Sequence, residues 1–288
     1  ALATSWEMSA DGTVYTFHLR QGVKWYDSEG KEKSELKAKD FVAAAEYILD
    51  SANASAIANT LYHTLKGGEA YFKGTTKDFS TVGIKAVDDY TLQYTLVGPL
   101  PYFLKMVSMN AWMPAQAEFL AENKAQFGTS NDMLLYCGAY FCETYEPEYQ
   151  RVLKMNDNYW DKDAISIKTL TWKYNKEAAS NGPELYLRGE TDTVSLSTEN
   201  VTEWMKDDNL WKQVHRAPYT NMSYFMTFNY DPKYEEQYKP EDWRTAVNTV
   251  NFRQSLFYGF DRYAAVATLD AYNYKDKVLN TYTRPGLV

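Results

Sequence analysis

Residues 136–160, YCGAYFCETYEPEYQRVLKMNDNYW, contain the patterns that decide the fold. They open with a turn of small residues, Cys137-Gly138-Ala139, where glycine lets another chain approach the backbone closely. Residues 151–156 then alternate polar and apolar side chains, as a half-buried strand does. Residues 156–158 are typical of a turn, and Tyr159-Trp160 follows. The stretch predicts a pair of strands followed by an aromatic pair, Tyr159-Trp160, which we call the aromatic clasp.

The composition is that of a globular protein with a sizeable core. The 288 residues are enough for two domains, and 45% are hydrophobic against 24% charged. Aromatic residues reach 16%, which suits cores, interfaces and ligand clefts alike. No apolar run approaches the roughly 18 to 20 residues that span a bilayer.

The net charge of −8 argues against nucleic acid and against a polybasic membrane surface as partners. The first six residues lack the basic start and apolar run of a signal peptide. They therefore predict either a cytoplasmic protein or one whose N-terminus has been removed.

The two cysteines, Cys137 and Cys142, lie five positions apart, which is an odd spacing. In one extended strand they would face opposite sides and could not form a disulfide without a turn between them. We expect two small, buried and free thiols.

Hairpins are predicted at residues 6–20, around Asp11-Gly12, and at 82–96, around Asp88-Asp89. Helical periodicity is strongest at 36–50 and 251–269. Further helices are predicted at 55–65, 103–109, 115–123 and 184–188, and one starts at Ser197. Further strands are predicted at 165–174, 193–196 and 221–229, and a surface loop at 230–242.

Groupings typical of an enzyme are missing from the sequence. The histidines lie far apart, at His18, His63 and His215. Neither a phosphate-binding glycine loop nor a Gly-x-Ser-x-Gly elbow is present. The acidic stretch at 143–148 is more typical of a solvated hairpin tip than of a glycosidase pair. We expect a protein that is not an enzyme and that carries neither a metal nor a cofactor.

Six further stretches, in order along the chain, resemble the family 5 extracellular solute-binding proteins, the peptide-binding components of ABC importers. They are WEMSADGTVYTFHLRQGVKW at 6–25, LKAKDF at 36–41, VDDYTL at 87–92, PYFL at 101–104, LRGETD at 187–192, and FRQSL to DR at 252–262. Residues 136–160 resemble that family's Gly-Pro/Ala-Tyr … Arg-Asn-Pro-x-Tyr-Trp segment. Lys37 stands where the family has a capping Thr, which weakens the cap of that helix.

The resemblance implies an α/β fold of the periplasmic-binding-protein type (type II, cluster C), with two lobes, a hinge and an added α+β domain. Residues 1–115 would be the added domain, 116–215 part of the first lobe, and 216–288 the start of the second lobe. Since members are usually much longer, the resemblance implies a fragment that lacks most of the second lobe.

The implied function is capture of an oligopeptide between lobes that close by hinge bending, followed by delivery to an ABC permease. Main-chain hydrogen bonds would make the affinity largely independent of peptide sequence. The resemblance also implies a monomer outside the cytoplasm, either periplasmic or anchored as a lipoprotein.

The resemblance assigns ligand contacts to four groups of residues. They are Tyr136, Cys137 and Gly138 in the turn, Ser195, Leu196 and Ser197 near the hinge, Asn221 and Tyr224 entering the second lobe, and Trp112 at the rim. Packing is the alternative for each of these residues, among them Trp112 and Tyr224, and a helix cap is the alternative for Ser197. The acidic residue that meets a peptide's amino terminus would lie in the missing portion.

Other functions stay open at this point. A receptor of the same fold could take an oligosaccharide, which the many aromatic residues allow, or a metal chelate, which the scattered histidines disfavour. A receptor that signals without import and a glycan-active enzyme are further alternatives. We expect the fragment alone to bind ligand weakly or not at all.

Overall fold

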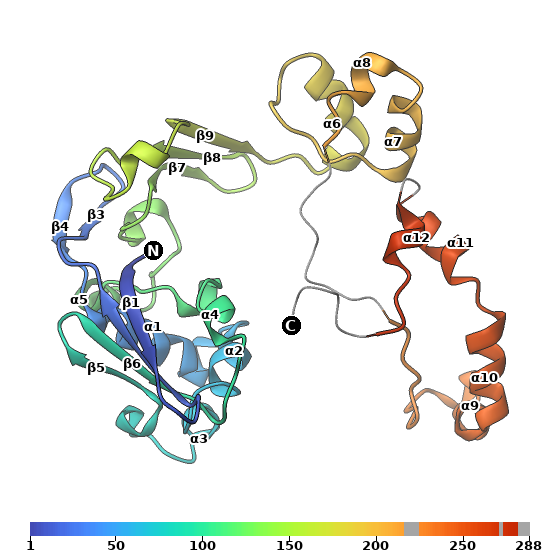
Figure 1. Cartoon of the computed structure of the whole chain (residues 1–288), viewed down its shortest axis with the longest axis horizontal. Helices are drawn as coiled ribbons and strands as arrows, with labels where there is room; N and C mark the ends of the chain where they lie inside the picture. The colour runs from blue at the N-terminus through green and yellow to red at the C-terminus, as the bar shows by residue number, and fades with distance from the viewer. Residues whose placement is uncertain (216–224, 271–272, 282–288) are drawn as a thin grey trace. The chain divides into compact units, whose positions relative to one another are not determined.

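The computed structural model describes residues 1–215, 225–270 and 273–281. The chain forms two compact units, Ala1–Asn175 and Lys176–Val288 (Figure 1). The three-part division with boundaries at 115 and 215 stays a prediction.

The main sheet of the first unit is antiparallel, with strand order β1-β2-β6-β5. Its strands are β1 (Ala3–Met8), β2 (Val14–Leu19), β5 (Ile84–Asp88) and β6 (Thr91–Thr95). Both hairpins predicted here are confirmed. At the first turn, Gly12 has a φ of 69°, and the Asp11 carboxylate accepts a hydrogen bond from the Thr13 N–H at 3.1 Å.

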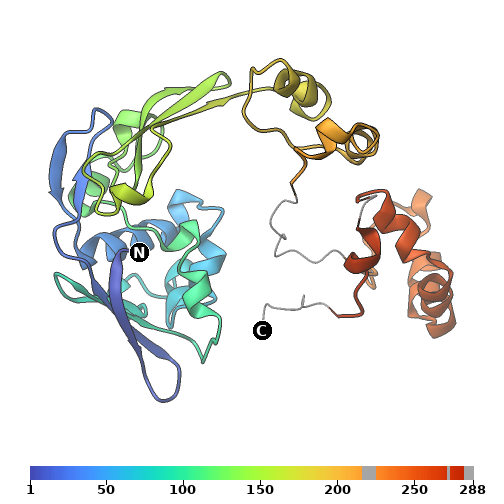
Figure 2. The same ribbon diagram turned by 45° about the horizontal axis from the view of Figure 1, so that its top comes forward.

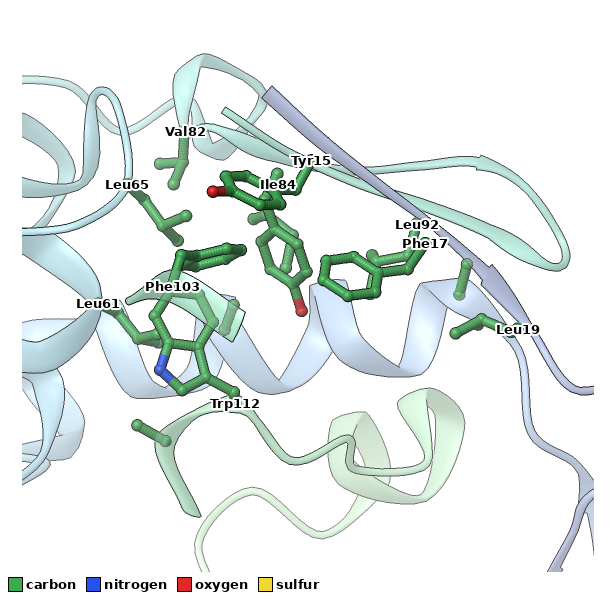
Figure 3. Packing of buried hydrophobic residues seen from close by; sticks show 14 of the residues in the cluster. Tyr15, Phe17, Leu19, Leu61, Leu65, Val82, Ile84, Leu92, Phe103 and Trp112 are labelled. Atoms are coloured by element: carbon green, nitrogen blue, oxygen red, sulfur yellow. The ribbon is translucent and has the colours of Figure 1, made fainter. Parts of the chain in front are cut away.

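One face of this sheet packs against α1 (Ala38–Leu49), and an aromatic cluster fills the space between them (Figure 3). The Phe103 ring lies 4.7 Å from Tyr15 and 5.2 Å from Trp112, between ring centroids. Burying a ring of this kind contributes about 1.5–3 kcal/mol. The core thus joins the sheet to the segments that follow it in sequence.

Short helices complete this part of the first unit. They are η1 (Ser51–Asn53), α2 (Ala58–Tyr62), α3 (Gly68–Phe72), η2 (Phe79–Thr81), α4 (Phe103–Met106), η3 (Asn110–Trp112), α5 (Ala117–Glu122) and η4 (Asn131–Met133). The helices predicted at 55–65, 103–109 and 115–123 are present but shorter.

A hairpin of β3 (Lys24–Tyr26) and β4 (Glu32–Glu35) lies between the main sheet and a second sheet of the same unit, in Figure 1 and Figure 2 alike. The second sheet has the antiparallel order β7-β8-β9, from β7 (Tyr140–Glu146), β8 (Gln150–Met155) and β9 (Thr169–Lys173). The strand pair predicted from 136–160 is confirmed. The strand predicted from residue 165 begins only at 169, because η5 (Lys162–Ala164) and a short connection precede it.

The second unit is helical in its described residues. Its helices are α6 (Ala178–Leu187), α7 (Thr198–Trp204), α8 (Asp208–Trp211), η6 (Glu236–Tyr238), α9 (Pro240–Asn248), α10 (Val250–Gly259), α11 (Arg262–Ala267) and α12 (Tyr274–Lys277). No helix in the described parts of either unit is both long and apolar enough to cross a membrane.

Two helix predictions in this unit need correction. The helix expected at 184–188 begins at Ala178, and Pro183 lies inside it. Gly182 and Pro183 are buried there, and a Cβ on Gly182 would come within 2.9 Å of Val194, so close packing offsets the poor helix propensity of both residues. The helix expected at 251–269 is two helices, because the Asp261 carboxylate caps α11 by accepting from the Ala264 N–H at 3.0 Å.

Two further expectations also change. Residues 193–196 contain no strand, and neither do residues 225–229. The rest of the strand expected at 221–229 lies outside the described residues. The expected surface loop at 230–242 contains η6 and the start of α9, whose first residue is Pro240, a favoured position for proline.

Candidate functional site

The turn at residues 136–139 is attached to the β3–β4 hairpin. Tyr26 and Tyr136 exchange two backbone hydrogen bonds, each of 2.8 Å. The Tyr136 hydroxyl donates to the Asn131 carbonyl at 2.7 Å, and burial raises the pKa of this tyrosine. One end of the turn is therefore fixed by main-chain and side-chain bonds to separate segments.

Asn156 fixes the other end of the turn and is only 3% exposed. Its backbone N–H donates to the Ala139 carbonyl at 2.8 Å, and its Nδ2 donates to the Gly138 carbonyl at 3.2 Å. Its Oδ1 accepts from the Asn158 N–H at 3.0 Å. The sequence predicted only a local turn at Asn156, because nothing in it shows the contact to Gly138, 18 residues earlier.

The outer side of the turn is open. Gly138 is exposed, and a Cβ built on it would have no heavy atom within 4 Å. Within the described part of the chain, the N–H groups of Gly138 and Ala139 donate to no acceptor. The turn therefore presents unpaired main-chain donors beside free space.

Cys137 and Cys142 are both free, as predicted, and both are half-buried. Burial raises the pKa of the Cys137 thiol to about 12, and the nearby charge of Asp40 adds to the rise. The Cys142 Sγ donates to the Thr144 carbonyl at 3.2 Å. A thiol with so high a pKa is a poor nucleophile and metal ligand, so Cys137 contributes shape rather than chemistry.

Asp40 lies in the first turn of α1 and is fully buried. Burial raises its pKa, while three N–H donors oppose the rise. The Lys37 N–H and the Trp25 indole donate to Oδ2 at 3.0 and 2.8 Å, and the Ala117 N–H donates to Oδ1 at 3.0 Å. The carboxylate thus offsets the weak cap at Lys37 and joins β3, α1 and α5.

Arg20, at the end of β2, reaches the aromatic clasp. Its guanidinium carbon lies 3.9 Å from the centroid of the Trp160 ring, a cation–π contact. Its Nε is buried without a hydrogen-bond partner. The aromatic pair Tyr159-Trp160 therefore contacts a cation from the end of β2, which no pattern in the sequence indicates.

The other predicted contacts lie elsewhere. Trp112 is 5% exposed in the core of the first unit, which is the packing alternative. Ser197 caps α7 by accepting from the Asn200 N–H at 3.2 Å, as its alternative predicted. Ser195 is exposed and Leu196 half-buried in the same unit as Ser197. Asn221 and Tyr224 lie outside the described residues.

The first unit also has a cavity of about 520 Å³ between the β3–β4 hairpin and α5. Its lining includes Asp27, Glu29, Lys31, Lys33, Gln116, Glu118, Phe119, Glu122 and Asp132. Lys33 pairs with Asp27 at 2.7 Å and Lys31 with Glu29 at 2.5 Å, so much of this charge is already matched. Among the described residues, no group of His, Cys, Asp and Glu side chains could hold a metal ion.

The sequence is similar to several oligopeptide-binding proteins. It is 32% identical to the oligopeptide-binding protein SarA of Streptococcus gordonii, over all of this chain and 45% of that protein. It is 31% identical to AliA of Streptococcus pneumoniae, over 100% of this chain and 45% of that protein. It is also 31% identical to OppA of Bacillus subtilis, over 92% of this chain and 45% of that protein. The chain thus spans about 45% of the length of these relatives.

Solved structures of the same kind share the fold. A substrate-binding domain of an oligopeptide ABC transporter from Bacillus anthracis matches with a TM-score of 0.65 and 33% identity, over 72% of this chain and 39% of that one. The pheromone receptor PrgZ, described with its mode of peptide binding, matches with a TM-score of 0.71 and 25% identity. The match covers 94% of this chain and 50% of that one. The family model of the bacterial extracellular solute-binding proteins, family 5 Middle, matches residues 1–287. The α/β fold of a periplasmic peptide-binding protein is therefore shown, and the chain belongs to the family 5 bacterial extracellular solute-binding proteins.

Proposed function

We propose that this chain is part of a receptor that captures oligopeptides outside the cytoplasm and delivers them to an ABC permease. The observation that carries the proposal is the open turn, where Gly138 and Ala139 have unpaired N–H groups beside free space. Membership in an extracellular solute-binding family and the oligopeptide-binding relatives support it.

Main-chain donors suit a peptide ligand for a physical reason. Every peptide unit carries a carbonyl oxygen, so an N–H group that binds it does not depend on the peptide's side chains. Fixed donors also lose little conformational freedom on binding. The bonds from Asn156 and Tyr26 hold the turn in place before a ligand arrives.

The remaining contacts and the organisation of the receptor belong to the same proposal. Ser195 and Leu196, near the hinge, and Asn221 and Tyr224, entering the second lobe, would meet the ligand when the lobes close by hinge bending. The domain boundaries at 115 and 215, a monomeric state and anchoring as a lipoprotein are parts of it that rest on the family resemblance.

A substitution at Gly138 tests the proposal without disturbing the fold. Its φ is not positive and its Cβ position is empty, so Gly138→Leu should fold normally and fill the space that a ligand needs. Gly98→Leu is the matched control, because Gly98 also has an empty Cβ position and no positive φ.

The measurement is tryptophan fluorescence of the full-length protein titrated with mixed peptides. We expect saturable binding by the wild type and by Gly98→Leu, and a loss of at least tenfold in affinity for Gly138→Leu. Equal binding by the two variants would remove the turn from the site, and no saturable change with the wild type would remove peptides as the ligand.

A further inference from the structure

The second unit buries few apolar side chains in its described residues. Apart from glycine and proline, its buried hydrophobic residues there are Trp204 and Val247, which are 7% and 0% exposed. The first unit, in contrast, has a continuous core of aromatic and aliphatic side chains. The burial of two side chains offsets only a small part of the conformational entropy that a chain of this length loses on folding. The second unit therefore needs apolar contacts beyond those among its described residues.

Helix α10 (Val250–Gly259) shows where such contacts are missing. The structure describes every residue of α10, and none is buried. Leu256, Phe257 and Phe260, the last of which caps the helix, are 37%, 62% and 51% exposed. Spacings of three and four residues place Phe260 on the same side of the helix as the other two. We call these three residues the α10 stripe.

The other sides of α10 are polar or already packed. Asn251, Ser255 and Tyr258 lie on the side away from the stripe, since each residue turns the helix by about 100°. Phe252 packs against Trp243 of the neighbouring helix α9, with 5.9 Å between the ring centroids (Figure 1). An exposed apolar stripe beside polar residues is characteristic of an interaction surface.

The lengths of the relatives indicate what covers the stripe. This chain spans 45% of SarA and 45% of AliA, so more than half of each relative lies outside the match. The match to PrgZ covers 94% of this chain but only 50% of that one. A segment of the same polypeptide is present at high effective concentration while the unit folds, whereas a second copy must first be encountered.

We propose that the α10 stripe is an interaction surface for an apolar segment of the same polypeptide, from the part of the full-length protein outside residues 1–288. This segment completes the core of the second unit by packing its apolar side chains on Leu256, Phe257 and Phe260. The proposal goes beyond the receptor function and does not depend on the ligand.

The test introduces a photoreactive phenylalanine analogue at position 257 of the full-length protein, or at position 258 as the matched control. Tyr258 is the next residue of α10 and is 80% exposed on the side away from the stripe. After irradiation, mass mapping identifies the peptide joined to each position. We expect position 257 to be joined, within one molecule, to a peptide outside residues 1–288, and position 258 to be joined to none.

Three results would overturn the proposal. They are a cross-link from position 257 to residues 1–288 of the same molecule, a cross-link to a second molecule, and the absence of any cross-linked peptide. The second of these would assign the stripe to a dimer.

Unfolding of the full-length protein in urea is an independent measurement. Phe257→Ala should lower the midpoint by roughly 1 M, as expected when a packed ring is removed, and Tyr258→Ala should change it much less. Equal midpoints for the two variants would show that the stripe is not covered and would overturn the proposal. Neither measurement uses a peptide ligand, so the proposal and the receptor function can fail separately.

Discussion

The indole Nε1 of Trp25 donates a hydrogen bond of 2.8 Å to Oδ2 of Asp40 inside the core of the first unit. The Lys37 N–H donates to the same oxygen, and the Ala117 N–H donates to Oδ1. An amide has only one acceptor oxygen, so Asp40→Asn leaves at least one of these buried donors facing an NH₂ group. We expect a loss of about 1–3 kcal/mol in the free energy of unfolding, measured by urea denaturation.

Asp50→Asn is the control for that variant. Asp50 is exposed at the other end of α1 and accepts from the Ala52 N–H at 3.0 Å, which an asparagine does equally well. Its free energy of unfolding should stay within about 0.5 kcal/mol of the wild type. If Asp40→Asn unfolds at the same urea concentration as the wild type, the buried carboxylate does not hold β3 and α5 to α1.

The carboxylate of Glu35 makes stability depend on pH. It accepts from the Tyr90 hydroxyl and from the Gly22 N–H, both at 2.7 Å, and these bonds hold its pKa below the ordinary 4.5. A lowered folded-state pKa gives stability that is present above pH 4.5 and is lost as the pH falls through the folded-state value. Tyr90→Phe should therefore cost stability at pH 7, and the cost should shrink at pH values below 4.5.

Unfolding at a series of pH values checks this prediction. Tyr102→Phe is a suitable control, because Tyr102 is 51% exposed and its hydroxyl has no hydrogen-bond partner among the described residues. A cost of Tyr90→Phe that does not change with pH would contradict the assignment to Glu35.

Asn156→Ala should destabilise the first unit. It removes the Nδ2 donor to the Gly138 carbonyl and the Oδ1 acceptor for the Asn158 N–H, and both of these hydrogen bonds are part-buried. We expect a loss of about 1–3 kcal/mol. Asn158→Ala keeps the backbone N–H that Asn156 binds and should cost less. If the two variants unfold at the same urea concentration, Asn156 does not fix the turn.

The thiol of Cys137 should be inert in the folded protein. Because burial raises its pKa to about 12, almost none of it is thiolate at pH 8, and alkylating reagents attack the thiolate. Burial also raises the pKa of Cys142, but the Arg151 charge opposes that rise. Mass mapping after iodoacetamide treatment should find Cys142 labelled before Cys137, and both labelled in urea. Early labelling of Cys137 would contradict the burial.

The hairpins could be predicted from the sequence because their turns depend on local chemistry. Asp11-Gly12 sets the first turn by a side-chain bond and a positive φ, which depend only on neighbouring residues. The strand pair at 136–160 followed equally from alternation and turn residues. The break at Phe260-Asp261 did not, because the apolar pattern continues through it and only the cap at Asp261 ends one helix and begins the next.

Less of the candidate site could be predicted from the sequence, because the site depends on contacts between residues that are distant along the chain. The small residues predicted the turn at Gly138, and the resemblance assigned ligand contacts to it, but neither indicates the bond from Asn156 that shapes the turn. Asp40 lies within the helix predicted at 36–50, but its contacts to Trp25 and Ala117 come only from the packing of three segments. Trp112 illustrates the same limit, since its aromatic ring suits a rim and a core alike.

The central claim is that the open turn belongs to a receptor that holds an oligopeptide unchanged. Calorimetric titration of the full-length protein with defined oligopeptides tests it most directly. The account predicts saturable heat at one peptide per protein molecule, with the peptide recovered intact afterwards. Absence of binding for every peptide length tested, or recovery of a cleaved peptide, would contradict it.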